Sequence, residues 1–572
     1  MIGRRLVRLS ILGLLSLAGA GCTSGTEPHI RPCTTLDDSV ILAPAQYVSI
    51  DPAVDSGCAV FPATVVAAEY LVVPQITTGV PGAKAGFRLG GDTILPPPPP
   101  SAPAGQLSTD IGDAERFHTF LRLGDERRRW GFDAVAAPAA GAPLEPASAS
   151  GPPGKNDRRV FRVCATVDCS RFNRVVARAR TVKSKVAIYV DSLAPGGGLD
   201  STALDSIASV FENRLYPTDT AAFGRESDID SNTVVMVLMT NTVNKLVSKT
   251  TCQKSGFVAG FFFGFDLDPR FRTDSRSNKG EVFYAIVPDP AGTLSCSHTA
   301  ADVESFVPVT FIHEFQHMIS FNQHVLVGGS VNGEVLWLNE GLSHYAEELG
   351  GRSYEVTPTA RISDCTIGTI TCRFYGGNAG NLQNAYTYLD STSKHFLEPT
   401  SGLGTLAERG AAWLFVRYVV DRYSAGNTMA DWNALTRAMV STTNTGAANI
   451  AAATGDPFTT VVSRWALANW VSDLPAFVAP AELQYDSWSF RSTYASLNAQ
   501  RPGTFPNPYP LVPTVSAGRD VSRNGTLLAG SGIYHRATQS PGDPGFTLSF
   551  TAPSGAVIDA AKVPRLNVIR IQ

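Results

Sequence analysis

A chain of 572 residues is too long for one ordinary domain, and its 44% hydrophobic residues can supply more than one core. A formal net charge of −3 argues against a dedicated nucleic-acid binder, which would normally carry a strongly basic face. These bounds predict roughly two to four domains and no nucleic-acid partner.

The first 21 residues have the pattern of an export signal. Residues 4–8 carry three arginines, residues 9–18 form an apolar run too short to span a bilayer comfortably, and residues 19–21 are small. Cys22 directly after small residues resembles a bacterial lipobox, which predicts cleavage before Cys22 and a lipid anchor on it. Ordinary secretion is the alternative. Either way the protein is expected outside the cytoplasm, as a cell-surface or outer-membrane lipoprotein or as a secreted protein, with membrane contact only through the anchor.

Cysteine usage also favours an exported protein. The chain has nine cysteines, and setting aside a lipidated Cys22 leaves eight, an even number that suits disulfides. The pairs that proximity in the sequence favours are Cys33 with Cys58, Cys164 with Cys169, Cys252 with Cys296, and Cys365 with Cys372. No Cys-x-x-Cys pair occurs, so a separate structural zinc site is not expected.

Residues 22–92 predict a small β-rich N-terminal domain. Its short strand-like runs, separated by Gly and Pro, are residues 47–50, 69–73 and 85–89. Residues 93–156 read as Pro/Ala-rich linkers around a helical segment at 107–133. This helix could belong to a pro-segment or could dock on the catalytic unit, and the sequence leaves both open.

Residues 157–500 predict the main domain, of the α+β class. Strand-like runs occur at 160–163, 175–180, 186–190, 234–239 and 281–287, with a helix at 199–215. A helical lobe follows, with candidate helices at 404–423, 429–439 and 457–471. Residues 501–572 predict a second small β-rich domain, with runs at 547–550 and 566–571. Whether the strand at 281–287 is an edge or an interior strand is left open.

A short acidic segment precedes the strand at 234–239. Asp228-Ile229-Asp230-Ser231-Asn232 alternates oxygen-bearing side chains, which Ca²⁺ prefers as ligands. The full calcium-loop pattern is absent, so an Asx-rich turn is favoured over a calcium site.

The segment that carries chemistry is His313-Glu314-Phe315-Gln316-His317. Residues four apart share a helix face, so the two histidine rings can converge on one metal ion, and two imidazoles with a carboxylate suit zinc. Glu314 sits beside the first ligand and can act as general base on a metal-bound water. Apolar residues at helical spacing predict a buried helix, and Pro308 suits its first position.

The third ligand separates the subclasses of such sites. A metzincin would need Gly at position 320 and His at position 323, whereas this chain has Ser320 and Gln323, and His324 is one residue out of register. The alternative is a carboxylate from a second helix, predicted at 336–349. Its candidates are Glu334, Glu340, Glu347 and Glu348.

Asn339-Glu340-x-x-Ser343 resembles the second motif of the gluzincin clan of zinc metallopeptidases. With Trp337-Leu338 before it and Gly341-Leu342 inside it, the pair of motifs looks like the hyicolysin-type family. The resemblance implies a zincin-like core, a mixed sheet with the HExxH helix followed by a helical lobe. It also implies one zinc ion, with His313, His317 and Glu340 as ligands and Glu314 as base. The Asp that thermolysin-like relatives carry four residues after the ligand Glu is here His344.

The resemblance therefore implies a zinc-dependent metalloendopeptidase acting on protein or peptide substrates. A zinc exopeptidase of the same clan and a non-catalytic surface adhesin with a degenerate core are the alternatives. Zincins often use a Tyr or His to stabilise the developing oxyanion. The tyrosines available for that role are Tyr375, Tyr386, Tyr388 and Tyr418, and the sequence does not choose among them.

Overall fold

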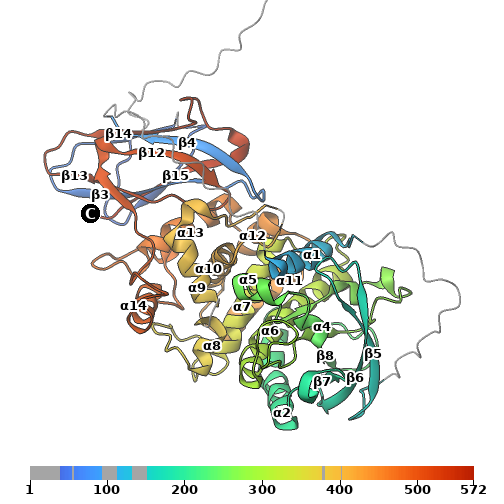
Figure 1. Cartoon of the computed structure of the whole chain (residues 1–572). Coiled ribbons are helices and arrows are strands. Elements are labelled where there is room, and N and C mark those ends of the chain that lie inside the picture. The colour runs from blue at the N-terminus through green and yellow to red at the C-terminus, as the bar shows by residue number, and fades with distance from the viewer. Residues whose placement is uncertain (1–38, 55–56, 93–111, 132–150, 377–379, 401) are drawn as a thin grey trace, which may run out of the picture.

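The computed structural model describes residues 39–54, 57–92, 112–131, 151–376, 380–400 and 402–572. It combines helices with three sheets, which is compatible with the α+β class predicted (Figure 1). In these described ranges no helix has both the length and the apolar character needed to cross a membrane. The expected signal peptide at 1–21 and the expected anchor at Cys22 lie outside them.

Strands from the two ends of the chain form one β-sandwich. One sheet has the order β1-β15-β3-β13-β11 and the other β12-β4-β14-β2. The N-terminal strands are β1 (Tyr47–Ile50), β2 (Cys58–Phe61), β3 (Ala68–Ile76) and β4 (Lys84–Gly90). The C-terminal strands are β11 (Thr514–Ala517), β12 (Ser522–Leu528), β13 (His535–Gln539), β14 (Phe546–Thr551) and β15 (Pro564–Arg570). The structure thus differs from the two separate end domains expected, because neither set of strands pairs only with itself.

Strand β3 shows how the sandwich joins the rest of the molecule. It lies between β15 and β13, and almost all of its residues are buried. Tyr70 and Val72 pack in the sandwich core, whereas Leu71 and Val73 belong to the core of the helical part. Alternate side chains of a strand point to opposite faces, so this continuous apolar run covers two cores at once.

The third sheet, of mixed direction, forms the centre of the main domain, in the order β5-β6-β7-β8-β10-β9. Its strands are β5 (Arg158–Cys164), β6 (Phe172–Val182), β7 (Val186–Asp191), β8 (Val235–Met239), β9 (Gly260–Phe262) and β10 (Val282–Ala285). Strands β7, β8 and β10 are parallel neighbours, and β9 pairs antiparallel with β10. The strand expected at 281–287 is therefore interior, and the edge is β9.

Helix α6 (Ala300–Ser320) packs against β9 and β10 and continues into a π-helical stretch, Phe321–Val327. Its N-terminus is closed by a capping box between Thr299 and Asp302. The prediction that Pro308 occupies the first helical position is wrong. The capping box starts the helix two turns earlier, and Pro308 lies inside it. Other helices around this sheet are α2 (Ser201–Val210), α3 (Tyr216–Phe223), α4 (Asn241–Asn244) and α5 (Lys249–Ser255).

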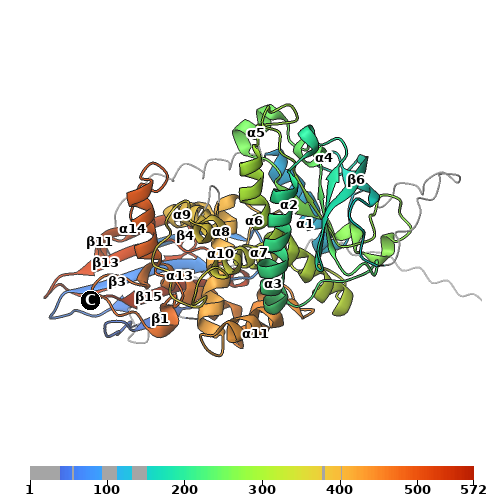
Figure 2. The same cartoon turned by 90° about the horizontal axis from the view of Figure 1, so that it is seen from below.

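Helix α7 (Leu336–Arg352) lies beside α6 and agrees with the helix expected at 336–349. The helical lobe follows, and Figure 2 shows it between the sandwich and the mixed sheet. It contains α8 (Ile370–Gly376), α9 (Asn381–Asp390), α10 (Leu406–Tyr423), α11 (Met429–Val440), α12 (Gly446–Thr454), α13 (Phe458–Val471) and α14 (Phe490–Gln500). The sequence predicted α10, α11 and α13, whose apolar spacing is strong, and missed the shorter α8, α9, α12 and α14.

Three of the four predicted disulfides are present: Cys164–Cys169, Cys252–Cys296 and Cys365–Cys372. Cys58 is also disulfide-bonded, while its predicted partner Cys33 lies outside the described residues.

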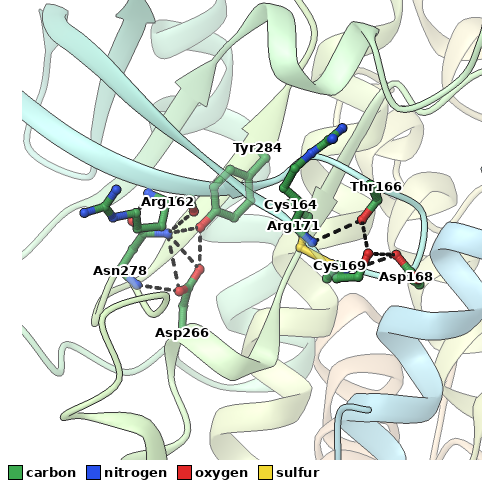
Figure 3. The surroundings of a disulfide bond; sticks show 10 residues. Arg162, Cys164, Thr166, Asp168, Cys169, Arg171, Asp266, Asn278 and Tyr284 are labelled. Carbon is green, nitrogen blue, oxygen red and sulfur yellow. Dashed lines mark hydrogen bonds between the residues drawn. A yellow bond between two sulfur atoms is a disulfide. The ribbon is translucent and has the colours of Figure 1, made fainter. Parts of the chain in front are cut away.

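The loop that follows β9 is held to the sheet beside the first of these disulfides. Figure 3 shows Asp266 accepting a hydrogen bond from the hydroxyl of Tyr284 on β10, close to Cys164–Cys169. The backbone N–H of Asn278 also donates to Asp266, at 2.6 Å, and burial raises the pKa of Asp266 to about 6. These contacts attach the loop after β9 to strand β10 and to Asn278.

Candidate metal centre

Two neighbouring helices bring three side chains to one point. His313 and His317 lie one turn apart on α6, and Glu340 lies in the second turn of α7. His317 and Glu340 are each 2% exposed, so the group they form with His313 is largely shielded from solvent. We call these three residues the metal cluster.

The spacing of the metal cluster suits a single zinc ion. The Nε2 atoms of His313 and His317 are 3.2 Å apart. The carboxylate of Glu340 lies 3.3 Å from His317 Nε2 and 3.6 Å from His313 Nε2. Around a tetrahedral zinc with bonds of about 2.0–2.1 Å, ligand atoms stand about 3.3 Å from one another. The two Nε2 atoms and the Glu340 carboxylate, which approaches His317 through Oε1 and His313 through Oε2, therefore have the spacing that zinc ligands require.

The other ring nitrogen of each histidine has its own partner. His313 Nδ1 is 2.7 Å from Glu347 Oε1. His317 Nδ1 is 3.0 Å from the side-chain oxygen of Asn339 and 3.1 Å from the hydroxyl of Ser343. Such contacts fix the ring orientation and leave Nε2 free to bind a metal.

The sequence named Glu347 only as a candidate for the third ligand, and its contact with His313 Nδ1 was not predicted. Glu347 follows Glu340 by seven residues, which is two helical turns, so both carboxylates share a face of α7. That periodicity is the signal that could have identified it. His344 lies in the same neighbourhood, with its Nδ1 atom 3.2 Å from Glu347 and its Nε2 atom 3.9 Å from Glu340.

The charges of the metal cluster are strongly coupled. Burial alone would lower the pKa of His313, but hydrogen bonds to Glu340 and Glu347 raise it to about 10. Burial and the nearby Arg122 lower the pKa of His317 to about 3. Burial opposes ionisation of Glu340, yet its bonds to the two histidines hold its pKa well below the usual value. A metal cation held by these residues would balance the charges of the carboxylates.

The side chain of Glu314, which follows His313 on α6, lies beside the two histidines of the metal cluster. It is 2% exposed, and its Oε2 atom accepts hydrogen bonds from the backbone N–H of Phe262 on β9, at 2.8 Å, and from Arg122, at 2.5 Å. Burial raises the pKa of Glu314, and the positive charge of Arg122 opposes this rise. A raised carboxyl pKa suits a group that must accept a proton near neutral pH.

The competing glutamates are engaged elsewhere. Glu334 accepts hydrogen bonds from Gly446 and Asn449 at the start of α12. Glu348 pairs with Arg352 and Arg417 inside the helical lobe. Of the four candidate glutamates for the third ligand position, only Glu340 has its carboxylate beside both Nε2 atoms.

The four candidate tyrosines for the oxyanion role have partners outside the metal cluster. The hydroxyls of Tyr386 and Tyr418 donate to the backbone oxygens of Asn507 and Glu482, respectively. The hydroxyl of Tyr388 bonds Ser531, and the ring of Tyr375 packs edge-on against Trp488. The structure therefore favours none of them for that role.

The acidic segment at 228–232 forms the expected Asx-rich turn. Backbone N–H groups of Asn232 and Thr233 donate to Asp230 and Asp228, respectively. Oxygens of Asp228, Asp230 and Glu281 do gather within 4.8 Å of one another. Asp230 is already paired with Arg159 at 3.4 Å, so its charge is balanced without calcium.

Arg122 is the other residue that the sequence analysis missed. It lies on α1 (Asp113–Arg127), is 1% exposed, and reaches Glu314 from a position 192 residues away in the chain. An arginine on an amphipathic helix normally faces solvent, and nothing in the local pattern of residues 113–127 distinguishes Arg122 from its neighbours.

Ligand atoms of His313, Glu314 and His317 lie within 4.8 Å of one another, as do those of His313, His344 and Glu347, and groups of this composition are suited to bind a metal ion. No protein-family profile matches the chain. A stretch of 145 residues is 30% identical to the neutral metalloprotease ShpI of Staphylococcus hyicus. The match covers 25% of this chain and 30% of that protein, so the chain spans less than a third of this relative's length. This similarity supports a relationship to metalloproteases, and with the His/Glu groups it suggests a metal-dependent hydrolase.

Proposed function

We propose that this protein is a zinc-dependent metalloendopeptidase with a zincin-like main domain. The observation that carries the proposal is the triangle of His313, His317 and Glu340, with sides of 3.2 to 3.6 Å, and the buried Glu314 beside it. The partial similarity to a neutral metalloprotease supports the same reaction class.

The residues have distinct roles in this proposal. His313, His317 and Glu340 hold zinc, which when bound supplies a Lewis acid that polarises the peptide carbonyl. The carboxylate of Glu314 takes the proton of the attacking water and later gives it to the leaving amine. Glu347 orients His313 through Nδ1, and Asn339 orients His317 in the same way.

The edge strand offers a place for the substrate backbone. Strand β9 pairs on one side with β10, and its other side is an edge of the sheet, to which an extended peptide can add its own strand. The bond from Phe262 N–H to Glu314 puts this strand next to the proposed base. We propose that a peptide lies along β9 with its scissile bond at the metal cluster.

The proposed enzyme acts outside the cytoplasm. The pattern of the first 21 residues supports export, and Cys22 is proposed to carry a lipid anchor on the bacterial cell surface. The three disulfides support an oxidising compartment. Mass spectrometry of the mature protein tests the anchor, because an unmodified Cys22 or a different first residue would contradict it.

Casein digestion tests the proposed activity most directly. Purified protein should release internal casein fragments, lose activity with 1,10-phenanthroline, and regain it with added Zn²⁺. Release of single terminal residues instead of internal fragments would indicate an exopeptidase. A protein that binds no zinc and cleaves no peptide would contradict the proposal.

A further inference from the structure

Helix α1 bridges the two walls beside the metal cluster. On the side of the mixed sheet, Asp125 accepts a hydrogen bond from the N–H of Gly264, just after β9, at 3.1 Å. On the side of α7, Glu126 accepts bonds from the N–H groups of Gly333, at 2.7 Å, and Leu336, at 3.2 Å. Figure 1 shows this helix against the main domain, near α5 and α7. The helix therefore connects the strand proposed to bind substrate with the helix that carries Glu340.

The side chain of Arg122 on α1 contacts Glu314, the proposed general base. Its guanidinium bonds Asp125 at 2.8 Å and Glu314 at 2.5 Å, and its Nε atom lies 3.8 Å from Glu340. A charged donor on the carboxylate of Glu314 competes with the water whose proton that carboxylate would take. The contact thus engages the group that the reaction needs free.

Little space is left beside the metal cluster. Asp125 of α1 and His317 of α6 line the same small cavity, of about 10 Å³, which is about the volume that one water molecule needs. A Cβ atom at Gly333 would lie 2.7 Å from the backbone oxygen of Asp125, so the chain segments are in close contact there. Helix α1 therefore packs closely against the surroundings of His317.

The residues that directly follow α1 are also anchored to the main domain. Trp130, which is 1% exposed, packs among Phe263, Phe265 and Phe271 of the loop after β9. Arg128 pairs with Asp268 of the same loop at 3.2 Å. These contacts favour the closed arrangement without involving the metal cluster.

We propose that residues 112–131 form an autoinhibitory segment, in which α1 closes the active site and Arg122 blocks Glu314. The inference rests on the proposed function, since it assigns regulation to the same site. The helix expected between two linkers would then both dock on the catalytic unit and act as an inhibitory segment. Strands β1–β4 are part of the sandwich, so only this inserted segment, and not the whole region before residue 151, has to move for activation.

Two variants that weaken the docked helix from opposite sides test the proposal in the full-length chain. Arg122→Ala removes the block itself. Gly333→Ala adds a methyl group against the backbone of Asp125 and changes neither α1 nor the metal cluster. Gly131→Ala is the matched control, because a Cβ there meets nothing within 4 Å. If the segment is inhibitory, both test variants should raise kcat/KM for a fluorogenic peptide by about tenfold or more, as the open population grows, and the control should not.

A binding measurement separates regulation from chemistry. A fluorescent peptide hydroxamate, which chelates zinc as it occupies the substrate position, should bind both test variants more tightly than wild type by a similar factor. If Arg122→Ala lowered kcat/KM at full zinc content, and Gly333→Ala brought no gain, α1 would be part of the working site and the inference would be wrong. Full zinc content without hydrolysis in any protein would overturn the proposed function alone, since tighter hydroxamate binding would still support the closing helix. Absence of zinc from every protein would overturn both.

Discussion

Glu347 on α7 lies 2.7 Å from Nδ1 of His313 on α6, and this contact links the two helices that carry the metal cluster. It fixes which nitrogen of His313 faces Glu340 and His317. A carboxylate in this position makes the imidazole a better metal ligand. The chain supplies it from a residue seven positions after Glu340, where His344 occupies the place of the expected Asp.

Weakening this contact should weaken zinc binding without removing the site. Glu347→Gln keeps the shape of the side chain and removes its charge, so we expect zinc affinity to fall by about 10–100-fold. Titration against a competing fluorescent chelator measures this affinity. Glu355→Gln is the control, because Glu355 is exposed and lies just after the end of α7. This variant should bind zinc as wild type does. Equal affinities in the two variants would show that Glu347 does not support His313.

Glu314→Gln should abolish peptide hydrolysis while zinc stays bound. The amide can still accept the N–H of Phe262, but it cannot take a proton from water. The loss in kcat/KM should be at least about 10²-fold. Metal analysis by mass spectrometry and a peptide assay on the same sample check both halves of this prediction. Zinc loss in this variant would contradict the role of Glu314 as base.

Glu340→Ala should lose both zinc and activity. Its carboxylate lies within 3.6 Å of the Nε2 atoms of both His313 and His317, and none of the other three candidate glutamates lies beside both of them. Glu334→Gln is the matched comparison, because Glu334 is equally buried but bonds Gly446 and Asn449. That variant should keep stoichiometric zinc even if it is less stable. If Glu340→Ala retained zinc and His344→Ala did not, the assignment of the third ligand would be wrong.

Glu398 should make stability fall as pH rises. It is fully buried at the junction of sandwich and helical lobe, and neither of its oxygens has a hydrogen-bond partner among the described residues. Burial raises its pKa to about 8 from 4.5. Below the pKa of 4.5 in the unfolded chain, Glu398 is protonated in both states, and it does not change the free energy of unfolding. Between that value and about pH 8 only the unfolded chain ionises at Glu398, so the free energy of unfolding falls, by on the order of 5 kcal/mol.

Glu398→Gln should remove this pH dependence. Denaturant unfolding at about pH 5 and about pH 8.5 should show the variant gaining stability over wild type at the higher pH only. Because both proteins share every other titrating group, the difference between them isolates Glu398. Two stability curves that stay parallel across this range would show that Glu398 does not contribute to the pH dependence.

Local patterns predicted much of this molecule. Helix α7 and the strands β5, β6, β7, β8 and β10 follow from apolar spacing, whereas the three-residue strand β9 was not predicted. Helix α6 also follows from apolar spacing apart from its start, which the Thr299 capping box places before Pro308. The convergence of His313 and His317 follows from helical periodicity. Glu340 was placed beside them by family resemblance, and the structure brings it there. That these three residues bind zinc is still a prediction.

Contacts between distant parts of the chain could not be predicted in this way. Arg122 meets Glu314 across 192 residues, and only the docking of α1 makes that contact visible. The strands β3 and β15, which pair with each other, are even further apart in the sequence. Each strand alone has the apolar pattern of an ordinary β-rich unit, which is why two end domains were expected instead of one.

The position of β15 sets an order on how this protein can be made. Residues 564–570 are synthesised after the mixed sheet and the helical lobe, yet they lie between β1 and β3, which are among the first described residues of the chain. The early strands must therefore wait, with apolar edges exposed, until those intervening elements have been synthesised. A chain that stopped before residue 564 would lack an interior strand of the sandwich. Such a product would be prone to aggregation, although all the residues of the metal cluster would be present.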